Sequence, residues 1–289
     1  IKKRGLSPTA VANLSLQCVS FVVGQAYLAD INKQLQGLEE GITTIQREME
    51  FEREAKIESS FRTLVRYVDR FDEYIQSNEK RQSALNEIER IRSEADAAWL
   101  FERNKIINLN KSISNSKRMN QDDVNSYLNK LRDTESQALV VYKLISVAEY
   151  VSMQYDNDFS TVRIERELSR LKDSLKEFEL PCNAAYKVLR SQIEVMKGRS
   201  IAIPPAKEDD YEYTNIIINT IHNKKREAER YTPLSLWNEG GRIHEERKKR
   251  YLDYARPKNT LLNTADEVSK ELANLNYVYN EAEAIVISE

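Results

Sequence analysis

The stretch that decides the fold is LADINKQLQGLEEGITTIQREM, residues 28–49. Apolar residues recur in it at alternating steps of three and four, at Leu28, Ile31, Leu35, Leu38, Ile42, Ile45 and Met49. This spacing is the heptad seam of an α-helix that packs along its length against another helix. We therefore predict that these seven residues contact a protein partner, a second copy of the chain, or another helix of the same chain.

The same pattern continues through residues 57–75, 124–151 and 164–178, and in the last range it runs through Ile164, Leu168, Leu171, Leu175 and Phe178. Only 7 glycines and 6 prolines occur in 289 residues, which leaves few places for tight turns. The 31% of charged residues suits the solvated faces of long helices. We predict an all-α fold, an elongated antiparallel helical bundle with long coiled-coil helices.

Polar residues and prolines give the expected ends of these helices. Asn120, followed by two aspartates, predicts a capped helix start. The polar run 108–120 predicts a loop, Asn157 and Asp158 an interruption, and Leu180-Pro181 a helix end. Residues 237–241, which include two glycines, predict a further loop.

The clearest linker is residues 199–210, which contain two adjacent prolines and an acidic cluster. We therefore expect a long helical coiled-coil bundle with an uncharged N-terminal helix at residues 1–198. A C-terminal helical segment at residues 211–289 is expected to pack on that bundle.

Residues 5–29 carry no charge, and their 25 residues are enough to span a bilayer. The apolar residues of this candidate membrane segment are Val11, Leu14, Leu16, Val19, Phe21, Val22 and Val23. Amides and hydroxyls such as Asn13 and Gln17 interrupt it, and they make membrane insertion costly. A buried or reversibly exposed helix is therefore favoured over a permanent membrane anchor, and a signal peptide is disfavoured further.

Enzymatic and metal sites are disfavoured by the residue inventory. The chain has only 2 histidines and 2 cysteines, and no glycine-rich phosphate-binding loop occurs. We expect no catalytic residue, no metal and no cofactor. Because two distant cysteines cannot form a disulfide framework, we expect a cytoplasmic protein, membrane-associated only if residues 5–29 enter lipid.

One local cluster of bases suggests phosphate binding, at Arg242, Arg247, Lys248, Lys249 and Arg250. Glu245 and Glu246 adjoin it and weaken its field. The formal charge of the whole chain is only -2, so bulk charge gives no indication of a nucleic-acid partner.

The leading hypothesis is a non-enzymatic helical scaffold or partner-binding coiled-coil protein. The alternative is an α-helical membrane-acting effector, pore-forming or membrane-disrupting, that uses residues 5–29. A weaker hypothesis is nucleic-acid binding through residues 242–258.

Overall fold

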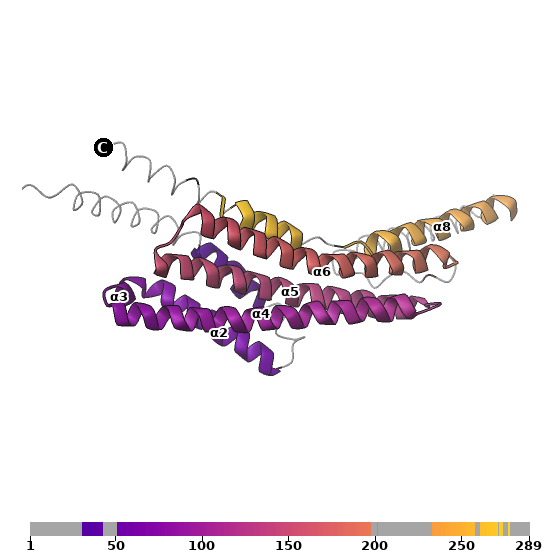
Figure 1. Cartoon of the computed structure of the whole chain (residues 1–289). Helices are drawn as coiled ribbons and strands as arrows, with labels where there is room; N and C mark the ends of the chain where they lie inside the picture. Colours follow the sequence, from indigo (N-terminus) through magenta and orange to yellow (C-terminus); the bar gives the residue numbers. More distant parts are fainter. Residues whose placement is uncertain are drawn as a thin grey trace, which may run out of the picture. The chain divides into compact units, whose positions relative to one another are not determined.

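The computed structural model describes residues 31–42, 51–197, 201, 233–257, 261–270, 272–273 and 277, with no side-chain detail at 51–54 and 233–243 (Figure 1). These residues are helical apart from short connections, and no strand occurs among them. Long helices pack against each other, which confirms the prediction of an all-α helical bundle.

The chain divides into two compact units, each built from segments that are far apart in sequence. Unit 1 comprises Ile1–Ile107, Arg132–Leu180 and Asn259–Glu289, and unit 2 comprises Asn108–Leu131 and Pro181–Lys258. Three long helices contribute to both units: α4 (Asn78–Asn115), α5 (Gln121–Asp156) and α6 (Thr161–Val195). The division expected at residues 199–210 stays a prediction, because that linker lies outside the described residues except for Ile201.

Within unit 1, α5 runs antiparallel to both α4 and α6. Arg81, near the start of α4, donates to the carbonyls of Tyr155 (2.5 Å) and Asp156 (3.0 Å), at the end of α5. Residues of α4 and α6 instead pair at a nearly constant separation of 74 or 75, as Asp96 does with Arg170 and Arg92 with Glu167, so these two helices are parallel. The buried Trp99 of α4 fixes the core between them, with its ring 5.7 Å from that of Tyr142 and 5.4 Å from that of Phe178.

Two shorter helices precede α4 in unit 1. Helix α2 (Phe51–Asp69) reaches the end of α5, where the buried Tyr155 hydroxyl donates to the Tyr67 carbonyl at 2.8 Å. The short helix α3 (Phe71–Ile75) follows, and the rings of Phe71 and Tyr74 both lie edge-on to Tyr155. An aromatic cluster therefore anchors this end of unit 1.

The helix at residues 31–42 packs on α5 through two glycines. A Cβ at Gly41 would lie 3.0 Å from Val140, and one at Gly37 would lie 3.3 Å from the Lys143 ammonium. That ammonium donates to the Gly37 carbonyl at 3.1 Å. The two glycines therefore allow the backbone of this helix to approach α5 closely.

In unit 2, helix α8 (Pro233–Tyr254) is held by contacts near its C-terminal end. The hydroxyl of the fully buried Tyr251 lies 2.8 Å from Asn125 Oδ1 and 3.2 Å from the Gln121 carbonyl, both on α5. Arg190 of α6 donates to the Leu252 carbonyl at 2.9 Å. These contacts give the last turn of α8 partners on α5 and on α6.

Two of the helix ends follow the sequence closely. Asn120 Oδ1 accepts from the Asp123 N–H at 2.9 Å, and Asp123 Oδ2 accepts from the Asn120 N–H at 3.0 Å, which confirms the predicted cap. At the other end of α5, Asn157 has a φ of 54°. The Asp158 N–H bonds to the Met153 carbonyl and the Asn157 N–H to the Gln154 carbonyl, which is the Schellman arrangement.

Three predicted helix boundaries were wrong. Helix α6 continues through Pro181, because the neighbouring Phe178 and Cys182 are buried and their packing outweighs the lost backbone hydrogen bond. Helix α4 extends to Asn115 because Ile113 is fully buried. Residues 237–241 belong to α8, since two glycines weaken a helix by only about 1 kcal/mol each.

Candidate functional site

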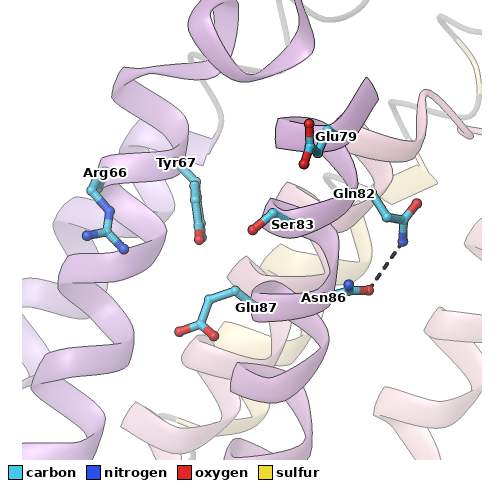
Figure 2. A pocket seen from close by; sticks show the side chains of 7 residues that line it. All are labelled: Arg66, Tyr67, Glu79, Gln82, Ser83, Asn86 and Glu87. Carbon is cyan, nitrogen blue, oxygen red and sulfur yellow. Dashed lines mark hydrogen bonds between the residues drawn. The ribbon is translucent and has the colours of Figure 1, made fainter. Parts of the chain in front are cut away.

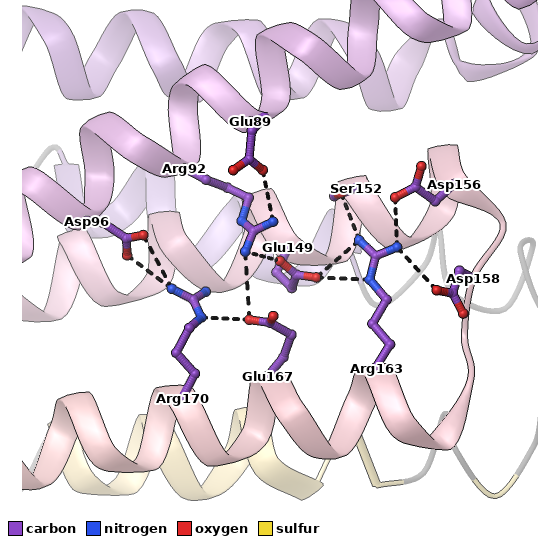
Figure 3. Close-up of polar contacts among 10 residues, drawn as sticks. All are labelled: Glu89, Arg92, Asp96, Glu149, Ser152, Asp156, Asp158, Arg163, Glu167 and Arg170. Atoms are coloured by element: carbon purple, nitrogen blue, oxygen red, sulfur yellow. Dashed lines mark hydrogen bonds and ion pairs between the residues drawn. The ribbon is translucent and has the colours of Figure 1, made fainter.

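The described part of unit 1 contains a charge cluster between α4, α5 and α6 (Figure 3). Its members are Glu89, Arg92, Asp96, Glu149, Ser152, Asp156, Asp158, Arg163, Glu167 and Arg170. At its centre, Arg92 Nη2 of α4 lies 2.9 Å from Glu149 Oε2 of α5 and 3.8 Å from Glu167 Oε2 of α6. One guanidinium therefore faces carboxylates from two neighbouring helices.

Arg163 links the start of α6 to the end of α5. Its guanidinium reaches Glu149 at 3.2 Å, Ser152 Oγ at 2.9 Å and Asp156 at 2.7 Å. Asp158, in the connection between the two helices, lies 3.7 Å from the same guanidinium. The turn between α5 and α6 is thus fixed by one side chain as well as by its backbone hydrogen bonds.

Arg170 makes the third link, from α6 to α4. It lies 3.1 Å from Asp96 of α4 and 2.7 Å from Glu167 on its own helix. Glu167 therefore lies between Arg92 and Arg170, and the three arginines and two buried glutamates form a continuous network. Figure 3 shows these side chains meeting from the facing sides of the three helices.

The surroundings of the carboxylates shift their pKa values in opposite directions. Burial raises the pKa of Glu149 above its ordinary value of 4.5, and the nearby Glu167 adds to this, although Arg92 and Arg163 oppose it. Burial also acts to raise the pKa of Asp158, but hydrogen bonds from Ser160 and the charge of Arg163 outweigh it, so this pKa is lowered.

A buried carboxyl with a raised pKa is a feature of general acids and bases. Here the two buried glutamates face arginine side chains from other helices. Among the residues that the structure describes, no group of three or more His, Cys, Asp or Glu side chains is placed to hold a metal ion. The arrangement is suited to holding three helices in one register, a use for which buried polar groups are well attested.

The spacing of apolar residues in α6 predicts a seam through Leu168, and the charge cluster does not lie on that seam. In the structure Leu168 is half-buried, and Glu167 is the buried residue between Ile164 and Leu171. Steps of three and then four lead from Ile164 to Glu167 to Leu171. A glutamate at a seam position, Glu167, was the signal in the sequence that could have indicated a buried charge.

A second feature is an open, polar groove of about 650 Å³ between α2 and α4 (Figure 2). Its lining residues are Arg66, Tyr67, Glu79, Gln82, Ser83, Asn86 and Glu87. The Gln82 amide donates to Asn86 Oδ1 at 3.2 Å, along the same helix. A hydrogen bond from Arg90 holds the pKa of Glu87 below its ordinary value. The groove presents charges of both signs.

The structure places part of the predicted seam inside the single chain. Ile31, Leu35, Leu38 and Ile42 are all buried. Leu28, Ile45 and Met49 lie outside the described residues. The described part of the seam therefore has neighbours within one chain, and its role towards a partner stays a prediction.

The predicted membrane segment, residues 5–29, also lies outside the described residues, so the membrane-acting hypothesis stays a prediction. Where the structure describes a helix, that helix is too short or too polar to cross a bilayer.

The predicted phosphate patch lies on α8 in unit 2. Lys249 is exposed, Arg247, Lys248 and Arg250 are half-buried, and the side chain of Arg242 is not among those described. Arg250 pairs with Glu246 at 2.8 Å, so part of the charge of this patch is balanced by an acid on the same helix. Nucleic-acid binding through this patch stays a prediction.

Helix α6 carries exposed aliphatic side chains on its outward face in unit 1. Val162 is 67% exposed and Leu180 is 66% exposed. They are 18 residues apart, which is five turns at 3.6 residues per turn, so they lie on the same side of the helix. Neither residue belongs to a site predicted from the sequence, where Leu180 marks only an expected helix end.

Comparisons with protein-family models, curated proteins and solved structures give no match.

Proposed function

We propose that the protein is a non-enzymatic helical scaffold that binds protein partners. Two features of unit 1 support the proposal. One is the charge cluster between α4, α5 and α6, and the other is the pair of exposed side chains Val162 and Leu180 on α6.

The charge cluster supports a scaffold because its groups contact each other across helices. Arg92, Arg163 and Arg170 each contact a carboxylate on a neighbouring helix. An interhelical ion-pair network of this kind favours one register of α4, α5 and α6 over its neighbours, since a shift by one turn would leave buried charges without their partners.

The observation that carries the proposal is the alignment of Val162 and Leu180 on one side of α6. Single exposed apolar residues are ordinary on protein surfaces, so their number alone would support nothing. Two large aliphatic side chains on one helix face, each about two-thirds exposed, provide anchors about 27 Å apart. Polar residues separate them, which suits contact with a partner helix or groove at both ends of this face.

The test is a comparison of two double variants of the full chain. Val162→Glu/Leu180→Glu places charges on the proposed face, whereas Ser93→Glu/Asn104→Glu adds the same charges at exposed positions of α4. We expect both variants to keep the helical content and melting temperature of the native chain. Crosslinking followed by mass spectrometry should show that only the α6 variant loses the partners of the native chain. If both variants retain the same partners, the α6 face is not the binding surface.

A further inference from the structure

The nearly neutral charge of the chain conceals two units of opposite sign. Unit 1 contains 24 lysines and arginines against 33 aspartates and glutamates, a formal charge of -9. Unit 2 contains 20 against 13, a formal charge of +7. Together they give the -2 of the whole chain.

The described residues alone show the same separation. They include 20 bases and 26 acids in unit 1, and 13 bases and 7 acids in unit 2. Because each unit is assembled from distant segments, acidic and basic segments follow one another along the sequence, and the net charge of either unit cannot be seen there. The separation becomes visible only once the fold assigns α4, α5 and α6 to both units.

Ion pairs within each unit do not cancel the net charge of that unit. In unit 1 the charge cluster holds six carboxylates against three arginines, so internal pairing still leaves an excess of acid. In unit 2 exposed bases occur on each of its segments, at Lys111, Lys117, Arg118, Lys187 and Lys249. Among the described acids of unit 2, Asp123 takes part in the capping of α5 and Glu246 pairs with Arg250.

We propose that copies of this chain associate through charge, with the acidic surface of unit 1 in one copy against the basic surface of unit 2 in another. This inference rests on the proposed partner-binding function and names a second copy as a partner. Contacts between two units 1 or between two units 2 would bring like charges together and are disfavoured. Every copy carries both surfaces, so the complementary surface is always present at the same concentration.

The distribution of bases in unit 2 favours a protein surface over a nucleic acid. Acids adjoin the bases at the end of α8: Arg250 pairs with Glu246 at 2.8 Å, and Arg256, just after the helix, pairs with Asp253 at 2.9 Å. A phosphate backbone is best matched by bases in a row along one face, whereas the four consecutive bases at 247–250 point to different sides of the helix. Unit 2 therefore has a mixture of acids and bases with a net positive charge. Such a surface suits an acidic protein surface that also mixes both signs, as unit 1 does.

Helix α6 offers a matched pair of variants. Lys172 and Lys176 are exposed on its unit 1 part, and Lys187 is exposed on its unit 2 part, with Lys249 exposed on α8. Lys172→Glu/Lys176→Glu makes unit 1 more acidic, whereas Lys187→Glu/Lys249→Glu makes unit 2 less basic. Each double variant replaces two positive with two negative charges and takes the formal charge of the chain from -2 to -6.

Sedimentation velocity of the full chain should show self-association that weakens as salt rises from about 0.1 M to 1 M, where the screening length falls from roughly 10 Å to 3 Å. We expect Lys187→Glu/Lys249→Glu to weaken the association about tenfold or more, because it removes attraction across the contact. We expect Lys172→Glu/Lys176→Glu to leave it unchanged or to strengthen it.

Three results would overturn the inference: a single monomeric species at the lower salt, an association that salt does not change, or equal weakening by the two double variants. Binding of a DNA duplex that is lost only in Lys187→Glu/Lys249→Glu, with no self-association, would instead assign unit 2 to a polyanion. If self-association is absent while the Val162 and Leu180 face still binds a partner, this inference fails and the proposed function stands.

Discussion

Arg92 Nη2 lies 2.9 Å from Glu149 Oε2, and their side chains are only 18% and 3% exposed. Removing one member of a buried ion pair leaves the other buried charge without compensation, which typically costs about 3–5 kcal/mol. We therefore expect Arg92→Ala to lower the free energy of unfolding by roughly this amount, as measured by urea denaturation.

Arg90, two residues earlier on α4, provides the control. It is half-exposed and pairs with Glu87 and Glu94 on its own helix. Exposed pairs of this kind contribute about 0–1 kcal/mol, so Arg90→Ala should have a small effect. Equal losses of stability in the two variants would show that the pairing of Arg92 with Glu149 does not stabilise the fold.

The raised pKa of Glu149 predicts a specific dependence of stability on pH. Because the folded state favours the neutral form, this group contributes stability that is fully present below its ordinary pKa of 4.5 and is lost as the pH rises through the raised value. Glu149→Gln is neutral at every pH. The free energy of unfolding of the native chain, minus that of Glu149→Gln, should therefore fall as the pH rises through this range. A difference that is constant with pH would contradict the assignment.

The two glycines that face α5 should respond differently to alanine. Alanine favours a helix over glycine by about 1 kcal/mol, and at Gly37 the new methyl group meets only the end of a flexible lysine. Gly37→Ala should therefore be neutral or stabilising. At Gly41 the methyl group would lie 3.0 Å from Val140, and overpacking of this kind costs about 1–3 kcal/mol.

Thermal melts of the two glycine variants, followed by circular dichroism, measure this difference. The helical content of both should match the native chain. If Gly41→Ala is as stable as Gly37→Ala, the close approach of residues 31–42 to α5 is not maintained in solution.

Replacing Pro181 should stabilise α6. Proline cannot donate a backbone hydrogen bond, and it disfavours a helix interior by about 3 kcal/mol relative to alanine. Pro181→Ala should therefore raise the free energy of unfolding by up to about 3 kcal/mol. Asn183→Ala, at an exposed position in the same turn, should raise the free energy of unfolding by less than about 0.7 kcal/mol. If the two gains are equal, α6 already accommodates Pro181 without cost.

Local signals in the sequence were sufficient for the fold class and for some helix ends. The cap at Asn120 and the termination after Asp156 depend on side chains and backbone within a few residues, so they could be predicted. The burial of Ile31, Leu35, Leu38 and Ile42 follows from their spacing.

Contacts between distant residues could not be predicted in this way. Whether Leu168 or Glu167 faces the core depends on how α6 is rotated against α4 and α5, and one residue of rotation exchanges them. Likewise, the local preference of Pro181 predicts a helix end, whereas the packing of Phe178 and Cys182 that overrides this preference depends on distant residues. The net charge of each unit could be predicted only with knowledge of which segments fold together.

The segmented construction of unit 1 also determines when it can be completed during synthesis. The Tyr150 hydroxyl of α5 lies 3.3 Å from the carbonyl of Val268, a residue 118 positions later in the chain. The helical residues described at 261–270 and 272–273 include the buried Ala265, Val268 and Leu272. At about 5–20 residues per second, a ribosome takes roughly 4–16 seconds to travel from Leu180 to Leu261. For that interval the nascent chain carries the unit 1 parts of α4, α5 and α6 while the apolar face that this later segment covers is still exposed.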